Sequence, residues 1–407
     1  MKKTKGEPLG AVFWVLTALS CVVTVCLQMT VTALPLWTVA KGYDTGTAGL
    51  STTLCTLAAL GFRPAAARCA RRLGEKRCAL VGAGSYVAVF FLCLFCQDLV
   101  ALLLLRSWQG VGMSLLTTAL GAMVTAVLPP DAITKGMGLF GLGNAVALSF
   151  GPALGLWLAD SGDFVWLFAV GLGLSVGLLV VLWALPAGPW DQVEKEPPTQ
   201  KRPAGFWQLC RLSGALGPSG LSFGLVFCQM ALSNYLSFWG QEQQVDGVSV
   251  FFTLNLFGMV VSRLCLGGIC QRFGEKPVGL CAAGLLIAAY AGLALWPGIG
   301  AVWLGGVLFG FGYGILYALL NAAAVAGCRQ AGMSPGEQAA ARSAANAAFF
   351  GAKDLGTALG SMGWGLVLGQ TGAGPLYGIC ALLTGAGAVL YGCGRIKKKG
   401  CCEHEKA

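Results

Sequence analysis

Long runs of apolar residues, separated by short polar segments, extend over almost the whole chain. A helix needs about 20 predominantly apolar residues to cross the hydrocarbon core of a bilayer. Six such runs precede one longer polar stretch, and six follow it. They cover residues 11–34, 46–66, 78–97, 99–128, 136–159 and 164–186, then 214–239, 247–270, 278–296, 299–327, 342–369 and 374–394. The pattern predicts an all-α integral membrane protein with twelve transmembrane helices in two pseudo-symmetric six-helix bundles.

The longer polar stretch, "AGPWDQVEKEPPTQKRPAGFWQLCRL", joins the two groups of runs. Its prolines Pro197, Pro198 and Pro203 argue against one continuous helix through it. We therefore expect four regions. They are an N-terminal six-helix bundle over 1–188, a cytoplasmic central loop over 189–212, a C-terminal six-helix bundle over 213–394 and a cytoplasmic basic tail over 395–407.

The composition agrees with this class. Of 407 residues, 56% are hydrophobic and the mean hydropathy is +0.72, which is more apolar surface than a soluble domain can bury. The beginning, "MKKTKGEPLGAVFWVLTALSCVV", has the basic and apolar regions of a secretory signal, but the apolar run is long and lacks a convincing cleavage site. We expect a retained first helix. The 17 cysteines lie mostly inside apolar runs without paired spacing, which indicates packing rather than disulfides.

Basic residues show which side of the membrane each loop faces. Cytoplasmic loops of membrane proteins carry an excess of Lys and Arg. If Arg63, Arg263 and Arg342 are counted as inner helix ends, 24 of the 27 basic residues fall on one side. Only Lys41 lies on the other side, while Arg106 and Lys353 fall inside predicted helices. The net charge of +10 is thus mainly an orientation signal, and both termini are expected in the cytoplasm.

The two halves repeat each other. "RRLGEK" begins at Arg71 and "QRFGEK" at Gln271, 200 residues later, and further matches occur in other predicted helices. Gly110 and Gly112 correspond to Gly310 and Gly312 at the same offset, and "GPALG" from Gly151 parallels "GTALG" from Gly356. An ordered series of this kind indicates two parallel six-helix repeats.

These motifs resemble those of the major facilitator superfamily (MFS) over the whole length of the chain. "RPAAARCARRLGEKR" from Arg63 is similar to the family's loop 2/3 signature, and "RSWQGVG" from Arg106 is similar to its helix 4 signature. "GPALG" from Gly151 resembles the helix 5 motif of the drug/proton antiporter-like branch. The resemblance implies a secondary transporter that works by alternating access, with proton-coupled efflux as the first expectation.

The loop 2/3 motif departs from the family pattern. Ala67 stands where the family has glycine, Arg71 where it has aspartate, and Glu75 where it has arginine. We hypothesise that Arg71 and Glu75 keep a charge contact of inverted sign. The alternative is a basic inner loop that only sets the orientation of the chain.

Three charged residues are candidates for proton coupling. Asp354 is the only acid that we place inside a span, about 12 residues (roughly 18 Å) into it, near mid-membrane. Lys353 is its neighbour in sequence, and the family resemblance implies a part in coupling for Arg106. Two interpretations stay open for Asp354, a proton-carrying group or a structural ion pair. Arg106 could instead reach the outer phosphates of the bilayer.

Uncharged polar residues in the predicted helices are candidates for a substrate cavity. The resemblance places the inner faces of helices 1, 4, 7 and 10 around a central cavity. The candidates are Gln28, Thr32, Gln109, Gln229, Asn234, Tyr313, Tyr317 and Asn321. Such groups suit a neutral or amphiphilic ligand. Hydrogen bonding between helices is the alternative role for all of them.

A third group of residues is expected to change its contacts as the bundles move. It consists of the loop 2/3 region, its repeat and the helix 5 motif. The residues are Arg63, Arg71, Arg72, Gly74, Glu75, Lys76, Gly151, Pro152, Gly155, Arg263, Arg272 and Gly274. Close helix packing by the small residues is the alternative explanation for the helix 5 motif.

The sequence lacks the residues that other functional classes of protein would need. An enzyme is not expected, because one membrane acid and a single histidine offer no catalytic constellation. No nucleotide-binding motif occurs, so a gradient rather than ATP is expected to drive transport. The tail residues Cys401, Cys402, Glu403 and His404 are metal-ligand types, but too few are fixed by structure, and we expect no metal and no cofactor.

The expected partners are a small-molecule substrate, protons and the lipid bilayer of the cytoplasmic membrane. No nucleic acid is expected, because the basic residues fall in short gaps between apolar runs. We expect a monomer. Two alternatives to efflux stay open, uptake of a small metabolite by proton symport and a receptor without transport activity on the same fold.

Overall fold

The computed structural model describes residues 10–128, 133–160, 164–186, 188, 214–296, 298–326 and 335–393. Within these ranges the ordered elements are helices, and no strand occurs. The central loop and the tail that we predicted lie outside the described residues. The prediction of an all-α protein with twelve long helices is confirmed, and one short helix, α2, adds to them.

Seven helices precede the central loop. They are α1 (Ala11–Ala40), α2 (Thr45–Ala48), α3 (Leu50–Leu73), α4 (Glu75–Cys93), α5 (Leu99–Val127), α6 (Ile133–Asp160) and α7 (Val165–Ala184). Six follow it. They are α9 (Leu216–Glu242), α10 (Val250–Phe273), α11 (Glu275–Leu295), α12 (Ile299–Ala326), α13 (Pro335–Thr371) and α14 (Ala373–Cys393).

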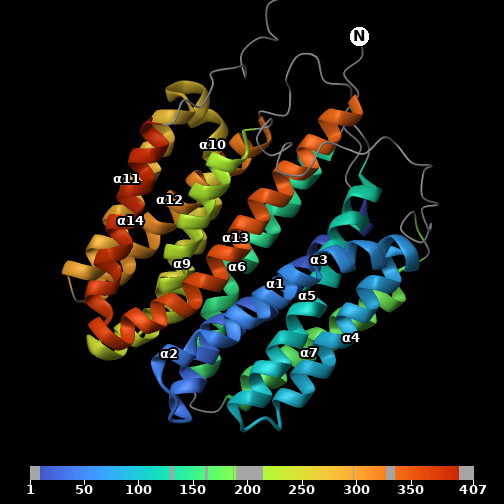
Figure 1. The fold of residues 1–407 in the computed structure, drawn as a ribbon, viewed down its shortest axis with the longest axis horizontal. Helices are drawn as coiled ribbons and strands as arrows, with labels where there is room; N and C mark the ends of the chain where they lie inside the picture. The colour runs from blue at the N-terminus through green and yellow to red at the C-terminus, as the bar shows by residue number, and fades with distance from the viewer. Residues whose placement is uncertain are drawn as a thin grey trace, which may run out of the picture.

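The helices form two groups, with α6 and α13 running between them (Figure 1). α6 packs on α1 of its own half and on α10 of the other half, while α13 packs on α9 of its own half and on α3 of the other. The two halves therefore meet along two related crossings, α3 with α13 and α6 with α10. α1 and α9 also contact each other across the halves.

Ten of the described helices are long and apolar enough to cross a membrane by composition alone. The two long helices that are not among them are α3 and α13, which carry charges inside the helix, including Arg63 in α3 and Lys353 and Asp354 in α13. Charges in a bilayer cost free energy unless they face protein or water. The two helices that are least apolar pack on each other, and this contact brings Arg63 of α3 to Asp354 of α13.

The internal repeat is visible in the helix boundaries. α3 and α10, α4 and α11, and α5 and α12 begin 200 residues apart, at 50 and 250, 75 and 275, and 99 and 299. Gly74 (φ 86°) and Gly274 (φ 81°) separate the first two helices of each set. Because these backbone angles are unfavourable for other residues, glycine at both positions permits the tight reversal.

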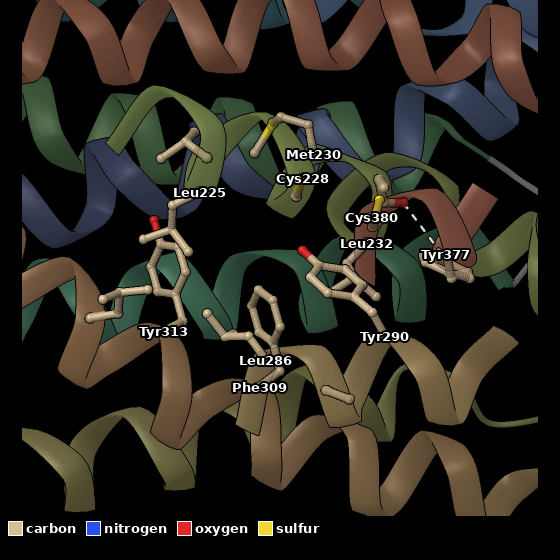
Figure 2. Packing of buried hydrophobic residues seen from close by; sticks show 14 of the residues in the cluster. Leu225, Cys228, Met230, Leu232, Leu286, Tyr290, Phe309, Tyr313, Tyr377 and Cys380 are labelled. Carbon is tan, nitrogen blue, oxygen red and sulfur yellow. Dashed lines mark hydrogen bonds between the residues drawn. The ribbon is translucent and has the colours of Figure 1, made fainter. Parts of the chain in front are cut away.

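The buried apolar residues form two clusters. One contains residues between Phe13 and Leu185 only, and the other is built from the second half with contributions from Ala48 and Leu156. Figure 2 shows part of the second cluster, where Tyr290, Phe309 and Tyr313 lie among leucine side chains. Two clusters fit two bundles, and the boundaries at 188 and 213 stay a prediction because the loop between them is not described.

The glycines repeated at offset 200 include one equivalent pair at very close helix crossings. A Cβ atom on Gly110 would lie 2.0 Å from the carbonyl oxygen of Cys55, and one on Gly310 would lie 2.3 Å from that of Asn255. No real Cβ atom tolerates such a distance from a backbone oxygen, so the helices would have to separate. These crossings, α3 with α5 and α10 with α12, explain the repeated glycines by packing.

We expect Gly110→Ala to destabilise the protein by about 1–3 kcal/mol, the usual cost of overpacking. At about 2–4 °C per kcal/mol for a chain segment of 150–250 residues, the melting temperature of the purified protein should fall by several degrees. Gly121→Ala in the same helix is the matched control, because nothing lies within 4 Å of its added Cβ. Equal melting temperatures for the two variants would contradict this explanation.

Candidate functional site

An ion cluster joins the two halves at the crossing of α3 and α13. Arg63 Nη2 lies 2.6 Å from Asp354 Oδ2, and Lys353 Nζ lies 3.1 Å from Asp354 Oδ1. Asp354 is only 2% exposed, whereas the side chains of Arg63 and Lys353 are 35% and 30% exposed. One buried carboxylate is thus shared by two cations that reach more open space. The arrangement fits an ionised carboxylate.

The structure corrects our placement of Arg63 and Arg263 at inner helix ends. α3 continues to Leu73 and α10 to Phe273, so each arginine lies ten residues before the end of its helix. The predicted spans stopped too early, at 66 and 270, because the charges that follow lower the hydropathy. The repeat at offset 200 was the available signal that the two arginines belong together.

Arg106 is enclosed in the first half, with 1% of its surface exposed. Its Nη1 donates to Thr30 Oγ1 at 2.8 Å and to Gln109 Oε1. The interpretation that this side chain reaches the outer phosphates is therefore wrong, because it turns into the protein toward α1. Its Nε and Nη2 atoms are buried without a protein partner. Arg106 and Asp354 form no ion pair with each other.

The candidate cavity residues divide by burial. Gln28, Thr32, Gln229, Asn234 and Tyr313 are buried, and the hydroxyl of Thr32 donates to the Gln28 carbonyl in its own helix. The amide nitrogen and oxygen of Asn234, which is 1% exposed, have no partner. This leaves Asn234 as a polar group that a ligand or water can satisfy.

The tyrosines of α12 lie on one side of the helix, as their spacing predicts. The rings of Tyr313 and Tyr317 stack with centroids 5.6 Å apart, and Phe309 continues the stack beyond Tyr313. Tyr313 belongs to the buried cluster of the second half (Figure 2), whereas Tyr317 and Asn321 are partly exposed. The stripe therefore runs from the core toward more open space.

Among the residues expected to change contacts as the bundles move, Arg63 contacts the other half through Asp354, whereas Lys76, Gly151 and Gly155 have contacts within their own half. Lys76 Nζ donates to the Leu185 carbonyl just after α7. Added Cβ atoms on Gly151 and Gly155 would meet Gln28 Cβ at 2.6 Å and the Met29 carbonyl oxygen at 2.3 Å, so these glycines hold α6 close to α1.

Other arginines that we expect to change contacts as the bundles move lie near helix ends. Arg72 and Arg272 are exposed, and Arg272 lies over the ring of Phe273 at 5.3 Å. The side chain of Arg71 lies outside the described residues. Its contact with Glu75 stays a prediction.

A seam of direct contacts closes the end of the molecule where α3 and α10 begin. Thr53 Oγ1 donates to the Ala358 carbonyl at 2.7 Å, and Asn255 Nδ2 lies 3.2 Å from Ser149 Oγ. The Cβ of any residue replacing Gly49 would lie 1.8 Å from the Ser361 carbonyl oxygen. Two of these contacts join α3 or its preceding turn to α13, and the third joins α10 to α6.

A cavity of about 350 Å³ lies at the same end. It is lined by Leu36, Val39, Ala40, Ala159, Phe164, Phe238 and Gln241. None of the candidate cavity residues lines it. We therefore place the candidate site at the ion cluster and at the polar groups between the halves rather than in this cavity.

Comparison with known proteins agrees with this architecture. The sequence profile of the Major Facilitator Superfamily matches residues 16–336. The multidrug export protein EmrB of Haemophilus influenzae is 24% identical over 31% of this chain and 25% of its own length. The uncharacterized MFS-type transporter YceJ of Bacillus subtilis is 26% identical over 71% of this chain and 72% of its own.

The match with EmrB thus spans only about a quarter of that relative. Among solved structures, a substituted form of the nucleoside transporter NupG has a TM-score of 0.74 and 16% identity. It covers 95% of this chain and 100% of its own. At this identity the likeness concerns the fold alone.

Proposed function

Because the chain belongs to the Major Facilitator Superfamily, a family of membrane transporters, we propose that it is a secondary active transporter that exports a small organic solute in exchange for protons. The observation that carries the proposal is the ion cluster at Asp354, because Asp354 is a buried acid that pairs with a cation of the other half. The similarity to EmrB, a multidrug export protein, supports export as the direction.

The proposed coupling follows from the charges. An ionised Asp354 attracts Arg63 across the seam and so favours contact between α3 and α13. A proton on the carboxylate removes that attraction, and the equilibrium between the two arrangements of the bundles shifts accordingly. Lys353 lies on the same helix as Asp354, so its pairing with the carboxylate does not join the two halves. Proton uptake is thereby linked to rocking of the halves.

We further propose that the described conformation is closed toward the outside and opens toward the cytoplasm. The contacts of Thr53, Asn255 and Gly49 between the halves lie at the end where α3 and α10 begin. The positive-inside distribution assigns that end to the outer side and both termini to the cytoplasm. A monomer in the cytoplasmic membrane completes the proposal.

Metabolite-loaded proteoliposomes can test this function before the substrate is identified. Vesicles with the purified protein are filled with a cell extract, a pH gradient is imposed, and mass spectrometry identifies the compounds that leave. We expect at least one compound to leave several times faster when the outside is acidic than without a gradient, and not from protein-free vesicles. A compound that leaves faster when the inside is acidic would instead support symport, and no gradient-dependent movement would contradict proton coupling.

A further inference from the structure

Arg263 occupies the position in the second half that Arg63 occupies in the first. Both are the fourteenth residue of a 24-residue helix, α3 or α10, and both helices cross into contact with the opposite half. The two arginines therefore face equivalent crossings. Their partners on those crossings differ.

The repeat identifies what faces each arginine. The motif "GTALG" of α13 begins two residues after Asp354, and the equivalent "GPALG" of α6 begins two residues after Ser149. Arg63 thus meets a helix that carries a carboxylate, whereas Arg263 meets a helix with a serine at the related position. Ser149 is already hydrogen-bonded to Asn255. The second crossing lacks the anion that the first one has.

Arg263 reaches across to α6 without finding a charge partner. Its Nη1 lies 3.9 Å from the position that a Cβ on Gly141 would take. Among the described residues, Asp354 pairs with Arg63 and Lys353, and no ion pair of Arg263 occurs. The Nε atom of Arg263 is buried and has no hydrogen-bond partner. Arg263 is partly exposed, so its guanidinium group is accessible to an anion that could pair with it.

The surroundings of Arg263 add aromatic surface. α10 and α12 approach so closely that a Cβ on Gly314 would lie 2.2 Å from Ser262 Oγ, which fixes Arg263 relative to Tyr313 and Tyr317. Both tyrosines lie within electrostatic range of the guanidinium, and Tyr317 also lies within range of Lys353 and Asp354. The partly exposed ring of Tyr317 is the last of three stacked rings, and Phe349 meets it in a T-shaped contact.

The charges between the halves do not balance. Arg63, Arg263 and Lys353 carry three positive charges, and the described acid among them, Asp354, carries one negative charge. Such an excess in a region of low dielectric constant attracts anions. A guanidinium group also binds a carboxylate through two parallel hydrogen bonds.

We propose that Arg263 binds the carboxylate of a planar organic anion and that the ring of this anion packs against Tyr317. The bound carboxylate takes the place at the α6–α10 crossing that the carboxylate of Asp354 takes at the α3–α13 crossing. This inference rests on the proposed transport function and names its substrate class. It differs from the neutral ligand that the uncharged residues suggested, because Arg263 was assigned to a helix end. Binding there would connect α10 with α6, and hence one half with the other.

Binding of naphthalene-2-carboxylate to the full-length protein in lipid nanodiscs tests the proposal. The neutral naphthalene-2-carboxamide has the same ring system and serves as the reference compound. By isothermal titration we expect the carboxylate to bind at least tenfold more tightly than the amide, and Arg263→Gln to weaken the carboxylate at least tenfold without affecting the amide. Arg77→Gln removes an exposed arginine of α4 and is the control variant. It should bind both compounds with the affinities of the wild-type protein.

Arg263→Lys keeps the charge but loses the paired hydrogen bonds, so an intermediate affinity is expected. The Arg263→Lys variant also provides the binding test if Arg263→Gln fails to fold. The proposal would be overturned if either variant bound the carboxylate as tightly as the wild-type protein does. It would also be overturned if the wild-type protein showed no preference for the carboxylate over the amide.

Transport of the same compound separates this inference from the proposed function. Arg263-dependent binding of naphthalene-2-carboxylate without any movement across proteoliposomes would leave the site standing and remove the transport function for this anion class. Movement that Arg263→Gln does not slow would retain transport and overturn the site. We expect both binding and movement to depend on Arg263.

Discussion

Asp354→Asn is expected to abolish the response of substrate flux to a pH gradient while leaving exchange of substrate down its own gradient intact. Asparagine fills the same space and cannot take up a proton, so the ion cluster is fixed in a single charge state. The change leaves Arg63 and Lys353 without their carboxylate, but both are partly exposed, so water can compensate them. Folding should therefore be retained.

The measurement compares gradient-driven accumulation with counterflow in proteoliposomes, using a compound identified from the metabolite-loaded vesicles. We expect at least a tenfold loss of the gradient-driven component, which corresponds to about 1.4 kcal/mol of coupling. Asp246→Asn, in an exposed position between α9 and α10, removes the same charge outside the cluster and should behave as the unchanged protein. A full gradient response in Asp354→Asn would assign Asp354 a purely structural role.

Gly49→Ala is expected to have an effect of similar size through a different cause. The added Cβ would lie 1.8 Å from the Ser361 carbonyl oxygen, which also accepts a hydrogen bond from the Tyr235 hydroxyl at 2.5 Å. The turn before α3 and α13 would have to move apart, and this seam joins the two halves. Destabilising the closed seam by about 1–3 kcal/mol shifts the population of that state by roughly 5- to 150-fold.

Flux of the identified compound and the melting temperature together test this expectation. Each bundle keeps its own buried cluster, so transport should fall at least tenfold while the melting temperature changes by only a few degrees. Gly61→Ala in α3 is the matched control, because its added Cβ meets nothing within 4 Å. Normal flux in Gly49→Ala would show that this seam does not limit the transport cycle.

The contrast between Gly49 and Gly110 shows why glycines in such a chain need the structure to be interpreted. Both are near α3 or pack on it, and both exclude a side chain because a carbonyl oxygen lies too close. Gly110 meets Cys55 within one half, so its replacement should affect stability. Gly49 meets Ser361 in the other half, so its replacement should affect the conformational cycle. Composition alone treats the two positions alike.

The apolar runs predicted the helices of this protein, because the bilayer requires backbone groups to be satisfied within each crossing segment. The repeated motifs likewise predicted the two-fold arrangement of the halves. The least apolar helices, α3 and α13, were recognised with boundaries seven residues short, at the ends where α3 finishes at Leu73 and α13 begins at Pro335. Their charges weaken the hydropathy signal on which the boundaries depend.

The membrane class, the number of long helices and the unusual position of Asp354 inside an apolar run can all be read from the chain without its structure, because a lone acid in such a run is costly wherever it lies. Which cation meets that acid depends instead on how the helices cross. Arg63 is 291 positions away from Asp354, and hydropathy places it at a helix end. Its partnership with Asp354, and the lack of a carboxylate for Arg263, arise from the contact of helices from different halves, which no local pattern encodes.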